Sequence, residues 1–156
     1  MFDDNLKLVD GSADWSYTNL HTNAYGQPVL TTRNDGGFAV LDMGVGGSPW
    51  AGLSIVMIFT EAAAATDDAL TAIAEECDDY DFSSSKPHEL AKFDIAATTK
   101  GVILGSEIAS TTIPVYVIRR VAFTRRYLRI SADCNAAGDD FGVVYCYVDP
   151  FTFKYS

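Results

Sequence analysis

The chain has 156 residues, of which 48% are hydrophobic, and this composition is sufficient for the core of one domain. Asp and Glu outnumber Lys and Arg by 21 to 11, and the resulting net charge of −10 repels nucleic acid and anionic membranes. The most apolar run, residues 53–59, is only as long as a strand, which excludes a membrane-spanning helix. We therefore expect one soluble domain whose partners are neither nucleic acid nor membrane.

Residues 1–7 carry acidic side chains where a secretory signal peptide needs a basic and then an apolar segment. This pattern predicts synthesis in a cytosol. The three cysteines, Cys77, Cys134 and Cys146, are widely separated and form no CxxC pair. They fit a reduced compartment in which thiols serve as small apolar side chains.

Turn-forming segments rich in Gly, Asn, Asp, Ser and Pro divide the chain at short intervals. The runs between them have the length of strands and are rich in Val, Ile, Phe, Tyr or Thr. We predict strands near residues 37–43, 52–60, 88–97, 101–105, 114–123, 126–134 and 141–148. This many short strands indicates a sandwich or a barrel.

Residues 61–77 admit two interpretations. Thr66 or Asp67 could cap a helix that carries Leu70, Ile73 and Cys77 along one stripe, and the alanines nearby favour it. Alternation of apolar and polar residues over 70–77 fits a strand as well, because long-range pairing often overrides local propensity. Periodicity alone leaves both structures open.

Two alternation patterns predict different surroundings. In residues 127–134, Leu128 and Ile130 face one way while Arg129 and Ser131 face the other, which predicts a strand with one face in water. Residues 113–118 and 53–59 are apolar on both faces. Such strands are expected where one face lies on the core and the other against a neighbour or a partner.

The sequence contains no recognisable catalytic constellation. His21 and His88 lie near no nucleophile motif, and we expect both to be ordinary surface or loop residues. The acids Glu75, Glu76, Asp78, Asp79 and Asp81 lack EF-hand spacing, so we expect a solvated loop there. The glycines of residues 44–50 have no P-loop lysine behind them. We predict neither a catalytic, nor a cofactor, nor a metal site.

Five of the 11 basic residues crowd into one segment, namely Arg119, Arg120, Arg125, Arg126 and Arg129. Guanidinium groups bind carboxylates in a bidentate manner, whether these belong to the same chain or to a partner. Both interpretations stay open from sequence alone, because exposed ion pairs contribute little by themselves.

Several short segments resemble those of a known family. They are residues 1–3 with Leu6, Val9 and Asp10, residues 48–50 leading into 53–56, residues 100–104, and residues 126–130. Through these segments the chain resembles the jelly-roll capsid cement, or decoration, proteins of tailed bacteriophages, particularly those of short-tailed phages. The resemblance implies an all-β fold, with a single jelly-roll β-sandwich of about eight antiparallel strands over residues 1–156. It also favours a strand over residues 70–77.

The resemblance further implies a function without enzymatic activity and without a cofactor. A cement protein joins neighbouring subunits of the major capsid protein from the outer surface of the virion, and it associates with copies of itself as a dimer or trimer. Synthesis would take place in the cytoplasm of the bacterial host. The acidic charge favours the outer face of the shell over the side that touches DNA.

We expect the two ends of the chain, an anchoring tryptophan and the arginine segment to contact partner subunits. Terminal aromatic residues are sticky unless something covers them. The predicted contact residues are Phe2, Asp3, Trp50, Arg119, Arg120, Arg125, Arg126, Arg129, Phe151, Phe153 and Tyr155.

A carbohydrate- or receptor-binding β-sandwich on the virion surface is the alternative. The aromatic faces of Trp15, Tyr17, Tyr25 and Trp50 could stack on sugars if they are exposed. An enzyme of cupin type, built on a related roll, needs a cluster of histidines for its metal. The two distant histidines of this chain disfavour it.

Overall fold

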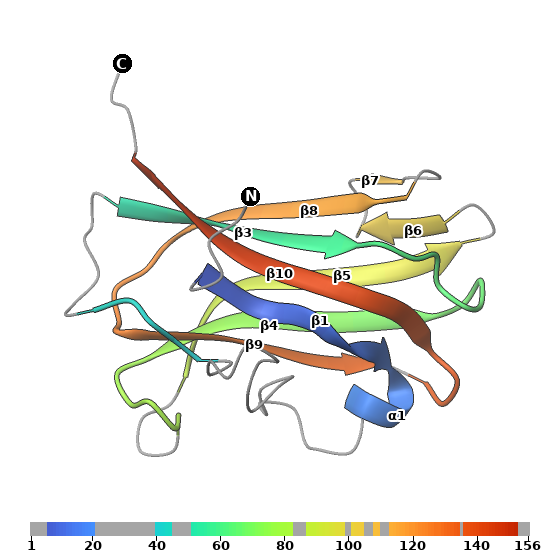
Figure 1. Ribbon diagram of the computed structural model, residues 1–156, viewed down its shortest axis with the longest axis horizontal. Helices are drawn as coiled ribbons and strands as arrows, with labels where there is room; N and C mark the ends of the chain where they lie inside the picture. The colour runs from blue at the N-terminus through green and yellow to red at the C-terminus, as the bar shows by residue number, and fades with distance from the viewer. Residues whose placement is uncertain are drawn as a thin grey trace.

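The computed structural model describes residues 6–20, 40–44, 51–82, 87–98, 101–104, 108–109, 113–134 and 136–152. Over these residues the chain forms two antiparallel sheets that pack face to face (Figure 1). In spatial order, the first sheet contains β1 (Lys7–Ser16), β10 (Asp140–Thr152), β3 (Ala51–Phe59) and β8 (Val115–Ala122). The second sheet contains β2 (Leu41–Asp42), β9 (Tyr127–Cys134), β4 (Ala69–Cys77), β5 (His88–Thr98), β6 (Gly101–Leu104) and β7 (Ile108–Ala109). A short helix, α1 (Tyr17–Leu20), follows β1.

The order of the strands defines a jelly roll. The chain alternates between the sheets along β1, β2, β3 and β4, and again along β8, β9 and β10, so most neighbours within a sheet are distant in sequence. This is the double Greek-key arrangement of eight strands, β1-β10-β3-β8 against β2-β9-β4-β5. The strands β6 and β7 extend the second sheet at one edge. The predicted all-β jelly-roll sandwich is confirmed.

The core lies between the two sheets and is built from alternate residues of their strands. Its largest fully buried side chains include Trp15, Phe59, Phe93 and Phe141. The rings of Phe59 and Phe141 meet edge to face, with centroids 6.0 Å apart. Aromatic pairs of this geometry stabilise a core beyond the area that they bury.

The predicted strands correspond to β3, β5, β6, β8, β9 and β10 with boundary errors of a few residues. The predicted strand over 37–43 is present as β2 alone, and residues 37–39 lie outside the described residues. The strand β10 continues to Thr152 and pairs there with Ala51 of β3, so Phe151 belongs to the sheet. The predicted strand over 141–148 therefore ended four residues too early.

The strand β1 was not predicted. It contains Asp10, Gly11 and Asp14, which have low β propensity, and its pairing with β10 is interrupted by three register shifts. Its inward side chains Leu8, Val9 and Trp15 are all buried in the core. Tertiary packing therefore overrides local propensity in this strand.

The ambiguous segment is a strand, β4, preceded by a turn that contains the alanine run. The buried carboxylate of Asp68 accepts hydrogen bonds from the amides of Ala65 at 2.9 Å and Asp140 at 3.2 Å. The Asp68 carbonyl accepts a further bond from Ala97. The local bond from Ala65 and the two bonds from distant parts of the chain hold the segment in a turn, although alanine favours a helix.

We predict that Phe141→Ala lowers the free energy of unfolding by about 3–5 kcal/mol, because it leaves a cavity against Phe59. Urea denaturation followed by circular dichroism measures this loss. Tyr116→Ala is the matched control, since the Tyr116 side chain is exposed and adds little to the core. Equal losses in the two variants would contradict the described packing.

Candidate protein-interaction surface

The outer face of the first sheet carries apolar side chains on three neighbouring strands. Along β8 the side chains alternate, and the outward Tyr116 and Ile118 are each 52% exposed. On β3 the outward residues are Val56 and Ile58, and Val56 is buried at the centre of the face. In Figure 1 this sheet lies in front of the second one. The two apolar faces that the sequence predicted for these segments are therefore present.

The strand registers align the outward residues of β8, β3 and β10 into three rows, which we call the outer face. Residues paired directly across an antiparallel ladder point to the same side of the sheet. The rows are Tyr116–Ile58–Tyr145, Ile118–Val56–Tyr147 and Arg120–Ser54–Asp149. Two rows are thus apolar or aromatic, and the third places a cation and an anion at its ends.

Two tyrosines of β10 present parallel rings on this face. The centroids of Tyr145 and Tyr147 are 6.3 Å apart and their ring planes differ by 9°. The Tyr145 ring passes so close to Gly11 that a β-carbon there would lie 2.5 Å from it. Gly11 also has a φ of 74°, which disfavours other residues. The glycine therefore allows the ring to lie against β1.

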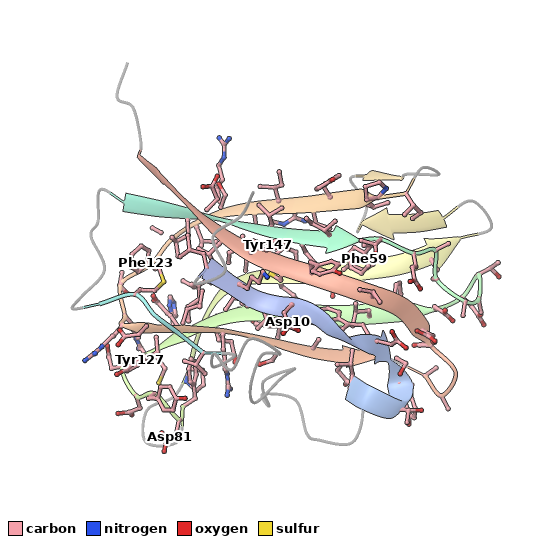
Figure 2. The ribbon with its side chains drawn as sticks, in the orientation of Figure 1. Asp10, Phe59, Asp81, Phe123, Tyr127 and Tyr147 are labelled. Carbon is pink, nitrogen blue, oxygen red and sulfur yellow. The ribbon has the colours of Figure 1, made fainter. Side chains whose placement is uncertain are left out.

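Charged residues of β1 border the outer face. Lys7 is opposite Tyr147 and Asp10 is opposite Tyr145, so both project on the same side as the tyrosines. Figure 2 shows Asp10 on β1 and Tyr147 on the neighbouring strand β10. Asp14 follows at the far end of β1, opposite Val143. The face therefore has an apolar centre and a polar margin, as protein interfaces commonly have.

The outer face of the second sheet is different, because it is polar. On β5, Lys92 and Asp94 form an ion pair of 3.0 Å, and the hydroxyl of Thr71 on β4 donates to Asp94 at 3.0 Å. Further along, Glu75 accepts bonds from Arg129 at 2.8 Å and Ser131 at 2.9 Å. Contiguous apolar groups in contact with water mark interaction sites. The outer face of the first sheet is therefore our candidate surface.

The clustered arginines take different roles. Arg126 binds Asp42 in a bidentate manner, with N–O distances of 2.8 and 2.7 Å. The Arg126 hydrogen bond and the Gly44 amide lower the pKa of Asp42 from its ordinary 3.8 to about 2. Arg125 lies 3.9 Å from Asp78. These two arginines therefore have intrachain partners at one end of the sandwich.

The other three arginines lie on β8 and β9. Arg129 is 6% exposed, is bonded to Glu75, and lies 4.1 Å from the centroid of the Phe82 ring. Arg119 stacks over Phe93 of β5 at 5.7 Å, while Arg120 is exposed on the outer face. Of the five, only Arg120 belongs to the candidate surface.

Two expectations about this region are wrong. The outward face of residues 127–134 is not generally wet, because Arg129 and Ser131 are 6% and 4% exposed. Glu75 and Glu76 lie on β4 and not in a solvated loop, and Glu76 is 1% exposed. Asp78 and Asp81 beyond the strand end are exposed, as expected. Cross-strand partners supplied by β4 and β9 account for both errors.

The buried carboxylate of Glu76 fixes the turn between β8 and β9. It accepts bonds from the amides of Thr124 at 2.7 Å and Arg125 at 3.0 Å, and from the Thr124 hydroxyl at 2.8 Å. The Nδ1 atom of His88 lies 2.8 Å from the same carboxylate. Figure 2 places Phe123 and Tyr127, which flank this turn, at one end of the sandwich. This link between the sheets was not predicted, and no sequence motif indicates it.

The hydrogen bonds outweigh burial in setting the acidity of Glu76. Burial alone would raise the pKa of this carboxyl, but the bonds from Thr124, Arg125 and His88 hold it below its ordinary 4.5. A carboxylate with a lowered folded pKa stabilises the fold above its unfolded pKa, and this stabilisation is lost as the pH falls through the folded pKa. Asp42 acts in the same direction.

We predict that the protein loses stability as the pH falls from 4.5 towards 2, and that Glu76→Gln reduces this dependence. At pH 7 the variant should lose about 2–4 kcal/mol, because the buried amide donors lose a charged acceptor. Urea unfolding at pH 7 and pH 3 measures both effects.

Thr124→Val is the graded control, since it removes the hydroxyl donor and keeps both backbone donors. It should show a smaller loss than Glu76→Gln at pH 7. A pH dependence in Glu76→Gln equal to that of the natural chain would contradict the role of this carboxylate.

Several predicted contact residues lie outside the described residues, namely Phe2, Asp3, Trp50, Phe153 and Tyr155. Phe151 lies on β10 opposite Gly52, and its side chain is not described. The partner contacts proposed for these six residues remain predictions. The candidate surface instead uses Tyr116, Ile118, Tyr145 and Tyr147. The sequence predicted strands at all four residues, but it predicted apolar character on both faces only for residues 113–118 and 53–59.

Two of the four aromatic residues considered for sugar binding contribute to the core. Trp15 is fully buried, and Tyr17 packs against the core. Tyr25 and Trp50 lie outside the described residues, as does His21. Trp15 therefore cannot stack on a ligand.

The three cysteines form no disulfide and are buried, as expected for thiols that serve as small apolar side chains. Burial raises the pKa of Cys134 to about 12, with a further contribution from Asp139, and burial also raises the pKa of Cys146. Thiols of this kind are poor nucleophiles.

Among the residues that the structure describes, no group of three or more His, Cys, Asp or Glu side chains could hold a metal ion. In the same part of the chain no helix is long and apolar enough to cross a membrane. The predicted lack of a cofactor and of catalysis stays a prediction.

No family model, no curated protein and no solved structure matches this chain. The jelly-roll class therefore stands on the strand order, and the resemblance to cement proteins stays a prediction.

Proposed function

We propose that this chain is a structural cement protein of a bacteriophage capsid, which binds the outer surface of the shell and stabilises contacts between major capsid protein subunits. It associates with copies of itself and has no catalytic activity. The observation that carries the proposal is the apolar outer face of the first sheet, which includes Tyr116 and Ile118 at 52% exposure. A surface of this kind suits binding to protein.

The fold and the charge support the same function. A jelly-roll sandwich is rigid and presents flat sheet faces, and such folds occur in viral capsid proteins. The net charge of −10 keeps the chain away from packaged DNA and is compatible with the outer side of a shell.

The energetic principle of such a protein is simple. A ligand that binds only the assembled shell stabilises that shell by mass action. Weak contacts repeated over a symmetric lattice add through multivalency, so no single contact has to be strong. A modest apolar surface is therefore sufficient for a cement function.

We predict that purified virions contain the protein in roughly stoichiometric ratio to the major capsid protein. Quantitative mass spectrometry of density-banded particles measures this ratio. Absence of the protein from banded particles would overturn the proposal.

In a reconstitution with shells that lack the protein, Ile118→Asp should reduce binding about tenfold or more, because a half-buried apolar contact is replaced by a charge. Co-sedimentation with the shells measures the bound fraction. A melting curve serves as the folding control, since Ile118 lies outside the core. Unchanged binding of this variant would show that the outer face does not contribute to attachment.

One observation favours the carbohydrate-binding alternative, through residues other than those expected. The parallel rings of Tyr145 and Tyr147, with centroids 6.3 Å apart, offer aromatic faces to a sugar chain. A glycan microarray with the natural chain and with Tyr147→Ala tests it. Binding that the substitution abolishes supports this function, and no binding by the natural chain excludes it for the glycans on the array.

A further inference from the structure

The three rows of the outer face are complementary to their own reversed order. From β8 through β3 to β10 they are Tyr–Ile–Tyr, Ile–Val–Tyr and Arg–Ser–Asp. Consider a two-fold axis that lies above the outer face and runs parallel to β3. A rotation of 180° about this axis exchanges the positions of β8 and β10 and leaves each row at its own level along the strands. A second copy turned in this way lays each row on its own reverse.

We propose that a second copy of this chain docks on the outer face, about a two-fold axis that runs along β3. Tyr116 then lies over Tyr145 of the second copy, and Ile118 lies over Tyr147. In the third row, Arg120 of each copy faces Asp149 of the other, so the ion pair forms twice. The inference names the self-association surface of the proposed function and rests on that function for its biological role.

The charges decide between this axis and the other two-fold axis within the interface. An axis perpendicular to the strands would lay β8 over β8 and β10 over β10. When this axis passes through the middle row, it reverses the order of the rows, so that Arg120 lies over Tyr116 of the second copy and Asp149 lies over Tyr145. Each charge is then buried without an opposite charge, which is costly. The axis along β3 pairs these charges instead and agrees with aligned sheet packing, in which the strands of two sheets cross at about 30°.

Pairing of two copies through the edges of the first sheet is disfavoured. The edge strand β8 carries Arg119, which turns inward over the Phe93 ring, and inward charges on edge strands oppose addition of another strand. Antiparallel pairing of β8 with β8 would also bring Arg119 and Arg120 of two copies together. At the opposite edge, β1 has three register shifts and several charged residues. The face is therefore the better surface for self-association.

The size of the face predicts a weak dimer. About an axis along β3, the three strands β8, β3 and β10 lie over their counterparts. At about 4.8 Å per strand and about seven residues of about 3.3 Å each, they cover roughly 14 by 23 Å, or about 330 Å². Two copies would bury about 660 Å² in total, which is below the size of stable specific interfaces. We therefore expect an equilibrium that depends on concentration, which a capsid lattice would strengthen.

Charge exchange tests the axis directly. Sedimentation equilibrium of the full chain at micromolar to millimolar concentration should show a monomer–dimer equilibrium. Arg120→Asp alone and Asp149→Arg alone should each weaken the dimer at least tenfold, since like charges then face each other twice. When the two variants are mixed, both charge pairs of the heterodimer are attractive, so association should return to near the natural level.

Lys92→Asp is the matched control, because it reverses a charge on the outer face of the second sheet. It should leave the dimer unchanged, and melting curves should confirm that every variant is folded. The proposal is overturned if the natural chain stays monomeric, if the single substitutions leave the dimer intact, or if mixing fails to restore association. These measurements contain no capsid, so their outcome is separate from the co-sedimentation test of the proposed function.

Discussion

The structure depends on the strand β3, which is apolar on both of its faces. Its inward residues, among them Ile55, Met57 and Phe59, are completely buried in the core. Its outward residues Val56 and Ile58 cannot enter that core, because a sandwich covers only the inner side of each sheet. An apolar outer face is therefore a consequence of the sequence of β3 and of its central position in the sheet.

The same strand organises its neighbours. Because β3 pairs in continuous register with β8 and with β10, their outward residues fall into straight rows without a bulge. At one end of β8, the buried Glu76 anchors the following turn to the second sheet through Thr124 and Arg125. The turn that follows β8 is thus held by a carboxylate that lies 48 residues before Thr124 in the chain, on the other sheet.

The arginines show how one residue type acquires several roles. Arg129 lies opposite Glu75 on the paired strand β4, and Arg126 binds Asp42 of β2 from the residue just before β9, so both serve the fold. Arg120 lies in a row whose other end is Asp149, and it serves the surface. Charge clustering in the sequence could not separate these roles, because the partner of each guanidinium comes from a strand that is distant in sequence.

The sequence by itself determined the β class, most strand positions, the buried thiols and the double-sided apolarity of two strands, because these follow from residues close together in the chain. It could not determine β1, where Asp and Gly disfavour a strand, nor the choice of a strand over a helix for residues 70–77. The tertiary structure decided both through pairing with β10, β5 and β9. It alone also decided the rows of the outer face and the burial of Glu76, because cross-strand register is set by the topology of the whole chain and has no local signal.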